Sequence, residues 1–188
     1  MHRFFDGWPS RREAYETIQR EKRLPIHSLI EHVSSRWLTL EPAAQRVLEQ
    51  MDALDEYFLR YLPKKNSKLA QKKACQSITQ FLKKPTRRAE LQFVISSARM
   101  FTQFTGLFQR DEPLVHVLYT ELEKLMKIIM GRVCKSGAIK DIGLKVEVFD
   151  KDNLIPLKNF ICADEVTTEL SQEKVSSLLT MEVRVLRC

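Results

Sequence analysis

The amino-acid sequence predicts a mainly α-helical fold organised around a helical bundle. Apolar residues recur every three or four positions through most of the stretch 39–136, which is the spacing of one helix face. Alternating apolar and polar residues, the pattern of a strand, are confined to two short stretches. The chain holds only 5 glycines among 188 residues, which argues against a turn-rich β fold and a glycine-rich phosphate loop.

The first forty residues predict one helix and one short strand. Ser10 is a candidate N-cap, with Glu13 three residues later as its capping-box partner. This helix is expected to reach about Lys22 and to end before Pro25, because the residue preceding a proline avoids the helical region. The segment 25–33 alternates apolar and polar residues and predicts a strand.

The next two helices are expected between breaks at prolines. Thr39 is the candidate cap of a helix that keeps its apolar spacing to Leu62 and stops at Pro63. Ser67 is the candidate cap of a second helix, which ends before Pro85.

The second half of the chain predicts two long helices and a mixed tail. The helix over 87–109 has an apolar stripe broad enough for the centre of a bundle. The helix over 114–134 is expected to be buried on much of its circumference. A short strand over 142–149, a turn at 151–153 and a helix over 164–179 are expected to follow.

Composition indicates a globular protein without a membrane partner. Hydrophobic residues make up 44% of the chain and charged residues 29%, as in globular domains. No apolar run reaches the ~18 residues of a membrane span, and the N-terminus lacks the apolar core of a signal peptide. We therefore expect an intracellular protein.

The net charge of +7 is unevenly distributed along the chain. The stretch from Lys64 to Arg88 has no acidic residue, whereas acids outnumber bases from Asp141 to Glu182. This asymmetry indicates either a polyanion partner or packing of the two regions on each other. Lysines are also common on ordinary solvent-exposed helices. The sequence therefore supports two interpretations of the basic segment equally: a nucleic-acid-binding surface and an ordinary solvent-exposed surface.

An Arg-Trp pair adds a second candidate contact with nucleic acid. A guanidinium binds phosphate and an indole stacks on a base, although Trp37 is also a candidate core anchor, because tryptophan is usually largely buried. The predicted nucleic-acid-binding residues are Arg36, Trp37, Lys64, Lys65, Lys68, Lys72, Lys73, Lys83, Lys84, Arg87 and Arg88.

The sequence predicts no metal site, no cofactor and no catalytic residues. Asp52 and Glu56 stand four residues apart, an arrangement that faces water far more often than it holds a metal. The cysteines lack a paired spacing and are expected to be free thiols, and a zinc site would need distant segments to converge. The residues concerned are Cys75, Cys134, Cys162 and Cys188, with His27, His32 and His116.

The order of these parts resembles the Arg-Trp region of hAT-superfamily transposases. The resemblance rests on 32–40, which contains Arg36-Trp37, on 43–50 and 54–58, on the tail segment 149–157, and on the stretch from Phe4-Phe5 to Tyr15. It is strongest to the domesticated, hAT-derived proteins of vertebrates, whose relatives often carry BED-type or other zinc fingers. It covers nearly the whole chain.

The resemblance implies a ribonuclease-H-like catalytic domain interrupted by an all-α insertion domain. It divides the chain into a partial ribonuclease-H-like segment ending in the Arg-Trp motif (1–38), a helical insertion-type bundle (39–136) and a mixed, truncated tail (137–188). In this family the tryptophan is thought to stabilise a flipped base. Trp37 is therefore expected to be partly exposed at a strand-to-helix junction, facing the Lys64–Arg88 side.

The resemblance also implies a function without catalysis on this chain. None of the family's Asp-Asp-Glu residues can be matched to a position here. We therefore expect a non-catalytic, hAT-derived fragment that binds nucleic acid or other proteins; the alternative is part of a full-length DNA transposase whose triad lies outside this chain. Expected partners are DNA, and a second copy or another protein on exposed apolar helix faces. A nuclear location is expected, with the cytoplasm as the alternative.

Overall fold

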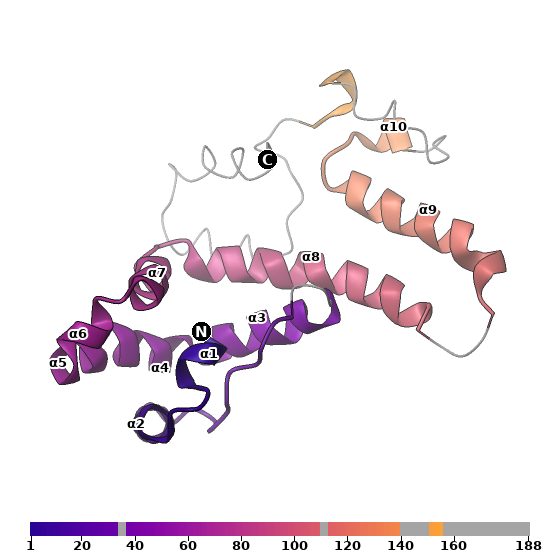
Figure 1. The fold of residues 1–188 in the computed structure, drawn as a ribbon. Helices are drawn as coiled ribbons and strands as arrows, with labels where there is room; N and C mark the ends of the chain where they lie inside the picture. The colour runs from indigo at the N-terminus through magenta and orange to yellow at the C-terminus, as the bar shows by residue number, and fades with distance from the viewer. Residues whose placement is uncertain (34–36, 110–112, 140–150, 156–188) are drawn as a thin grey trace. The chain divides into compact units, whose positions relative to one another are not determined.

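The computed structural model describes residues 1–33, 37–109, 113–139 and 151–155. Over these residues the protein is mainly α-helical, as predicted, and the only β pairing among them is an isolated bridge (Figure 1). The chain divides into two compact units, Met1–Ile95 and Ser96–Cys188, which are described separately. The division at residues 38 and 136 and the ribonuclease-H-like element remain predictions.

The first unit consists of short helices that follow one another closely. Its elements are α1 (His2–Phe5), α2 (Pro9–Glu21), the 3-10 turn η1 (Trp37–Thr39), α3 (Leu40–Glu49), α4 (Met51–Asp55), the π-helical turn η2 (Glu56–Tyr61), α5 (Leu62–Lys65), α6 (Ser67–Ala70), α7 (Lys73–Leu82) and the first part of α8 (Arg87–Leu107).

An aromatic cluster forms the centre of this unit. Phe5 of α1, Tyr15 of α2 and Tyr57 and Phe58 of η2 are all buried. The Phe5 and Tyr15 ring centroids lie 4.7 Å apart, and those of Phe5 and Tyr57 lie 5.1 Å apart. Helix α1, which the periodicity did not predict, is thus held by its aromatic contacts with residues on both sides of position 38.

Two predicted helix caps are wrong. The single helices predicted from Thr39 to Leu62 and from Ser67 to Pro85 are also each divided into shorter elements, the second into α6 and α7. Helix α2 begins at Pro9, one residue before Ser10, and its N-cap Trp8 makes no side-chain capping bond. Asn66 replaces Ser67 as the cap of α6, because its side-chain oxygen accepts from the Leu69 N–H at 2.9 Å. The chain also continues helically through Pro63 to Lys65, since this proline lies in the first turn of α5.

The strand predicted over 25–33 is wrong: this segment has no regular secondary structure. Side chains of neighbouring helices donate to its carbonyl groups in place of a strand neighbour. Gln50 Nε2 lies 3.0 Å from the Pro25 oxygen, Gln19 Nε2 lies 2.9 Å from that of His27, and Arg46 Nη1 lies 2.8 Å from that of Ser28. Three carbonyl groups of this segment therefore have hydrogen-bond partners without a sheet.

The Gln19–Gln50 pair is the buried polar centre of this arrangement. Both side chains are fully buried, and Gln19 Nε2 also donates to Gln50 Oε1 at 2.8 Å. The two amides therefore tie α2, the residue before α4 and the extended segment together.

The second unit contains the rest of α8, then α9 (Val115–Gly131), α10 (Ser136–Ile139) and the turn η4 (Lys151–Asn153). The predicted spans of α8 and α9 and the turn at 151–153 are confirmed to within three residues. A bridge between Cys134 and Leu154 brings η4 against the end of α9. The predictions for 142–149 and 164–179, and Cys162 and Cys188, lie outside the described residues.

The predicted burial of α9 is wrong for the described side chains. Only Leu125 and Met130 of this helix are buried. Val115 is 82% exposed, Tyr119 57% and Ile128 54%. Helix α9 therefore presents apolar side chains to solvent.

Candidate nucleic-acid interface

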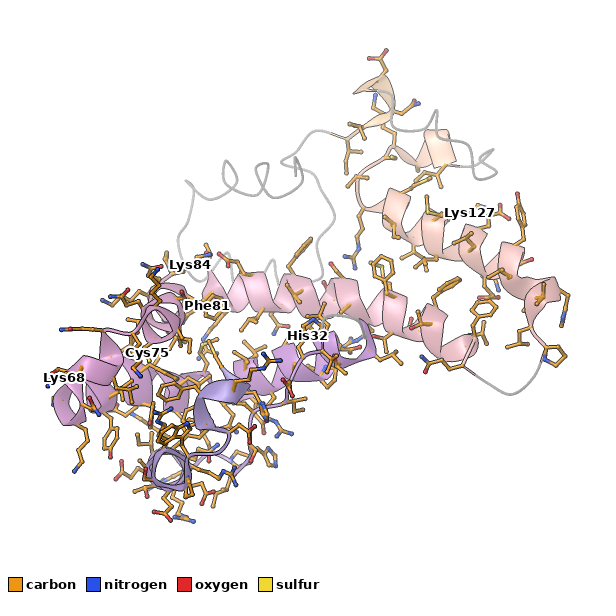
Figure 2. The ribbon with its side chains drawn as sticks, viewed as in Figure 1. His32, Lys68, Cys75, Phe81, Lys84 and Lys127 are labelled. Atoms are coloured by element: carbon orange, nitrogen blue, oxygen red, sulfur yellow. The ribbon has the colours of Figure 1, made fainter. Side chains whose placement is uncertain are left out.

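The predicted basic segment runs from α5 to the start of α8. All of its lysines are exposed, and they lie in or next to the short helices α5, α6 and α7; they are Lys64, Lys65, Lys68, Lys72, Lys73, Lys83 and Lys84. Figure 2 labels Lys68 and Lys84 at opposite ends of this stretch, with Cys75 of α7 between them. The structure thus brings the predicted lysines to the surface of a single unit.

Helix α7 is anchored by its apolar side. Cys75 and Leu82 are buried in the core of the first unit, and Ile78 and Phe81 pack against that core while partly exposed. These positions repeat at helical spacing, which predicts one inward face. The side chains of Lys73 and its neighbours on the other face are exposed.

Three of the predicted contact residues are engaged in ion pairs within the protein. Arg87 Nη2 lies 2.6 Å from Asp55 Oδ2, and Arg88 Nη2 lies 2.8 Å from Asp52 Oδ1. Lys84 Nζ lies 3.1 Å from Glu90 Oε2. Their charges are therefore partly neutralised, and the two arginines join the start of α8 to α4.

The other predicted lysines have no acidic partner in the part of the chain that the structure describes; they are Lys64, Lys65, Lys68, Lys72, Lys73 and Lys83. We call these six the free-lysine surface. No acid lies between Lys64 and Arg88 in the sequence, so no neighbour within this stretch neutralises these six charges.

Asp55, the ion-pair partner of Arg87, is a partly buried carboxylate. Burial raises its pKa, and the Arg87 guanidinium opposes that rise. Its Oδ1 atom is buried without a hydrogen-bond partner. Sequence reasoning missed this residue as the partner of Arg87, because the two stand 32 positions apart and no local pattern connects them.

The carboxylates of Asp52 and Glu56 do not combine into a metal site. Asp52 binds Arg88, and Glu56 lies 3.2 Å from Lys22 Nζ and 3.0 Å from Arg60 Nη1. The Lys22 hydrogen bond lowers the pKa of Glu56, which keeps that carboxylate charged. No group of three or more metal-ligating side chains occurs in the described ranges.

The described cysteines are free thiols buried in apolar surroundings. Cys75 and Cys134 are both buried, and burial raises the pKa of each thiol. A raised pKa leaves the thiol protonated and unreactive. Both residues are therefore packing groups in their respective units.

The residues that flank the Arg-Trp motif are joined by hydrogen bonds. Trp37 opens η1, while Arg36 and the Trp37 side chain lie outside what the structure describes. Thr39 Oγ1 accepts from the Val33 N–H at 3.1 Å and lies 2.9 Å from His32 Nδ1. These contacts hold the entry and exit of the motif together, and the exposure and direction of Trp37 remain predictions.

A second Arg and Trp combination escaped the sequence-based prediction. The Arg11 guanidinium lies 4.2 Å from the Trp8 ring centroid and 4.6 Å from that of Phe4. Trp8 is 54% exposed. Its three-residue spacing from Arg11 was the available signal. The guanidinium makes a cation–π contact with this exposed indole.

Comparisons with known proteins give one partial relative. No family model matches the chain, and no solved structure matches it. The chain is 32% identical over 123 residues to human "Zinc finger BED domain-containing protein 4", covering 65% of this chain and 10% of that protein. It therefore spans about a tenth of the relative's length. The chain is thus loosely related to a BED-type zinc-finger protein, in keeping with the coarse form of the hAT resemblance.

In the described residues, no helix is long and apolar enough to cross a membrane.

Proposed function

We propose that this chain is a non-catalytic, hAT-transposase-derived module that binds nucleic acid through its free-lysine surface. The observation that carries the proposal is the exposure of six lysines without acidic partners in one acid-free stretch of the first unit. Lysines of this kind bind phosphates as point charges and position a strand without reading bases.

Binding through phosphates has a thermodynamic signature. Each phosphate contact releases condensed counterions, so the affinity falls steeply with salt concentration. Arg87 and Arg88 contribute less than the free lysines, because Asp55 and Asp52 already hold them.

The experiment is a fluorescence-anisotropy titration of the full chain with duplex, hairpin and single-stranded DNA. Replacing two free lysines in K64Q/K65Q is expected to weaken binding. The matched control K124Q/K127Q removes the same charge from α9, where both lysines pair with glutamates at 2.6 and 2.8 Å. Equal losses in the two variants, or no binding by the parent protein, contradict the proposal.

The alternative proposal is that the chain is part of a longer DNA transposase. Its support is the relative, which is about ten times longer than the matched piece. Reading the flanking genomic frame separates the two proposals: aspartates upstream and a glutamate downstream of the chain, in frame, favour the enzyme. A nuclear location follows from either proposal and is tested by imaging the tagged chain.

A second candidate function, association with another protein or a second copy, is favoured by the exposed apolar side chains of α9. Val115, Tyr119 and Ile128 are each more than half exposed. Light scattering over rising protein concentration is expected to show a rising mass, and a strict monomer at every concentration contradicts this candidate.

A further inference from the structure

We propose that α7 lies in the major groove of duplex DNA, with Gln76 and Gln80 at base edges and lysines at both helix ends on the phosphates. This inference rests on the proposed function and specifies which nucleic acid the free-lysine surface takes.

The burial pattern of α7 leaves one face available for such contact. Lys73, Gln76, Ser77 and Gln80 are exposed, whereas Cys75 and Leu82 are buried. The exposed positions repeat at three- and four-residue spacing, so their side chains lie along one side of the helix. The buried residues fix the opposite side to the core, and the exposed side faces outward as a unit.

The length of α7 suits the groove. Its 10 residues correspond to about 15 Å of helix. The major groove of B-DNA is about 12 Å wide. Lysines at the start, Lys72 and Lys73, and at the end, Lys83, therefore lie far enough apart to reach phosphates on both sides of the groove.

The two glutamines have the chemistry for direct readout. Neither side chain makes a hydrogen bond to another described residue, so both amides are available to a ligand. Glutamine pairs in a bidentate manner with the N6 and N7 atoms of adenine. Four residues of helix rise about 6 Å, close to two base steps of about 3.4 Å each, so adenines two steps apart are the expected targets.

The composition of the surface favours duplex DNA over other nucleic acids. Single-strand binding uses exposed aromatic side chains as stacking platforms, yet the one aromatic residue between Lys64 and Arg88 is Phe81, which packs against the core. The major groove of A-form RNA is too deep and narrow for side chains to read.

The test is selection of bound duplexes from a random-core library by the full chain. The parent protein is expected to enrich adenine at two positions two steps apart. Q76A/Q80A is expected to lose this enrichment and to bind the selected duplex about 30-fold more weakly or worse, because two bidentate pairs are removed. Its melting curve is expected to be unchanged because both residues are exposed. K64Q/K65Q is expected to weaken all sequences alike.

The outcomes separate this inference from the proposed function. If no nucleic acid binds, both fail. If duplexes bind and K64Q/K65Q weakens them, but the library shows no enriched base or Q76A/Q80A binds as the parent does, only the α7 assignment is overturned. Competition adds a groove-specific check. Displacement of the protein from the duplex by methyl green, a major-groove ligand, supports the α7 assignment. Displacement by the minor-groove ligand netropsin alone overturns the α7 assignment. Single-stranded DNA or duplex RNA binding as tightly as duplex DNA also overturns it.

Discussion

The guanidinium of Arg87 bridges two elements that are distant in sequence: Nη2 donates to Asp55 Oδ2 at 2.6 Å, and Nη1 donates to the backbone oxygen of Leu82. The bond to Leu82 satisfies the C-terminal end of α7, where helix carbonyls otherwise lack partners. The bond to Asp55 ties α8 to α4. Arg87 therefore joins the end of α7 and α4 to the start of α8, in addition to its predicted role as a phosphate contact.

Arg87→Ala is expected to destabilise the protein by about 1–3 kcal/mol, because it leaves the half-buried Asp55 carboxylate without its main partner. Urea denaturation measures the change in the free energy of unfolding. Arg60→Ala is the matched control: its pair with Glu56 is on the surface, with the Arg60 side chain 70% exposed, and such pairs contribute about 0–1 kcal/mol. Equal losses in the two variants would show that the Arg87 bridge has no special structural role.

The raised pKa of Asp55 predicts how the free energy of unfolding changes with pH. Because burial raises its pKa in the folded state, the folded protein binds the proton more readily than the unfolded chain does. The contribution of this residue to stability is therefore largest at low pH and is lost as the pH rises through its raised pKa. The unfolding free energy of the parent minus that of Asp55→Asn is expected to fall over the pH range just above about 3.9, the ordinary pKa of aspartate. A difference that rises over this range contradicts the assignment.

Gln50→Leu is expected to release the extended segment 25–33. The substitution removes the acceptor of Gln19 and the donor to Pro25, both inside the first unit. Buried groups left without partners cost about 1–3 kcal/mol. Hydrogen exchange is expected to accelerate in 25–33 while α7 stays protected, and Gln45→Leu, at an exposed position of α3, serves as control. Uniform acceleration across the first unit would indicate global destabilisation instead.

The helices over 87–107 and 115–131 were predictable because their signal is local. Apolar residues repeat along each, and the breaks at Pro85 and Pro113 bound them. The caps were less predictable: Asn66 and Ser67 are both good capping residues, and the sequence does not say which one adopts the non-helical conformation.

The extended segment 25–33 and the acidic partners of the arginines were not predictable, because both depend on long-range contacts. Gln50 and Gln19 reach this segment from separate helices and replace the hydrogen bonds of a strand neighbour. Asp52 and Arg88 stand 36 residues apart. The composition of the basic stretch was visible in the sequence; which of its charges are free became visible only in three dimensions.

The most direct test of the central claim is the salt dependence of duplex affinity. For duplex DNA each phosphate contact contributes about 0.9 to the slope of log affinity against log salt. K64Q/K65Q is therefore expected to lower the magnitude of that slope by about 1.8, while K124Q/K127Q leaves it at the parent value. A parent slope near zero, or the same slope in parent and K64Q/K65Q, would contradict binding through the free-lysine surface.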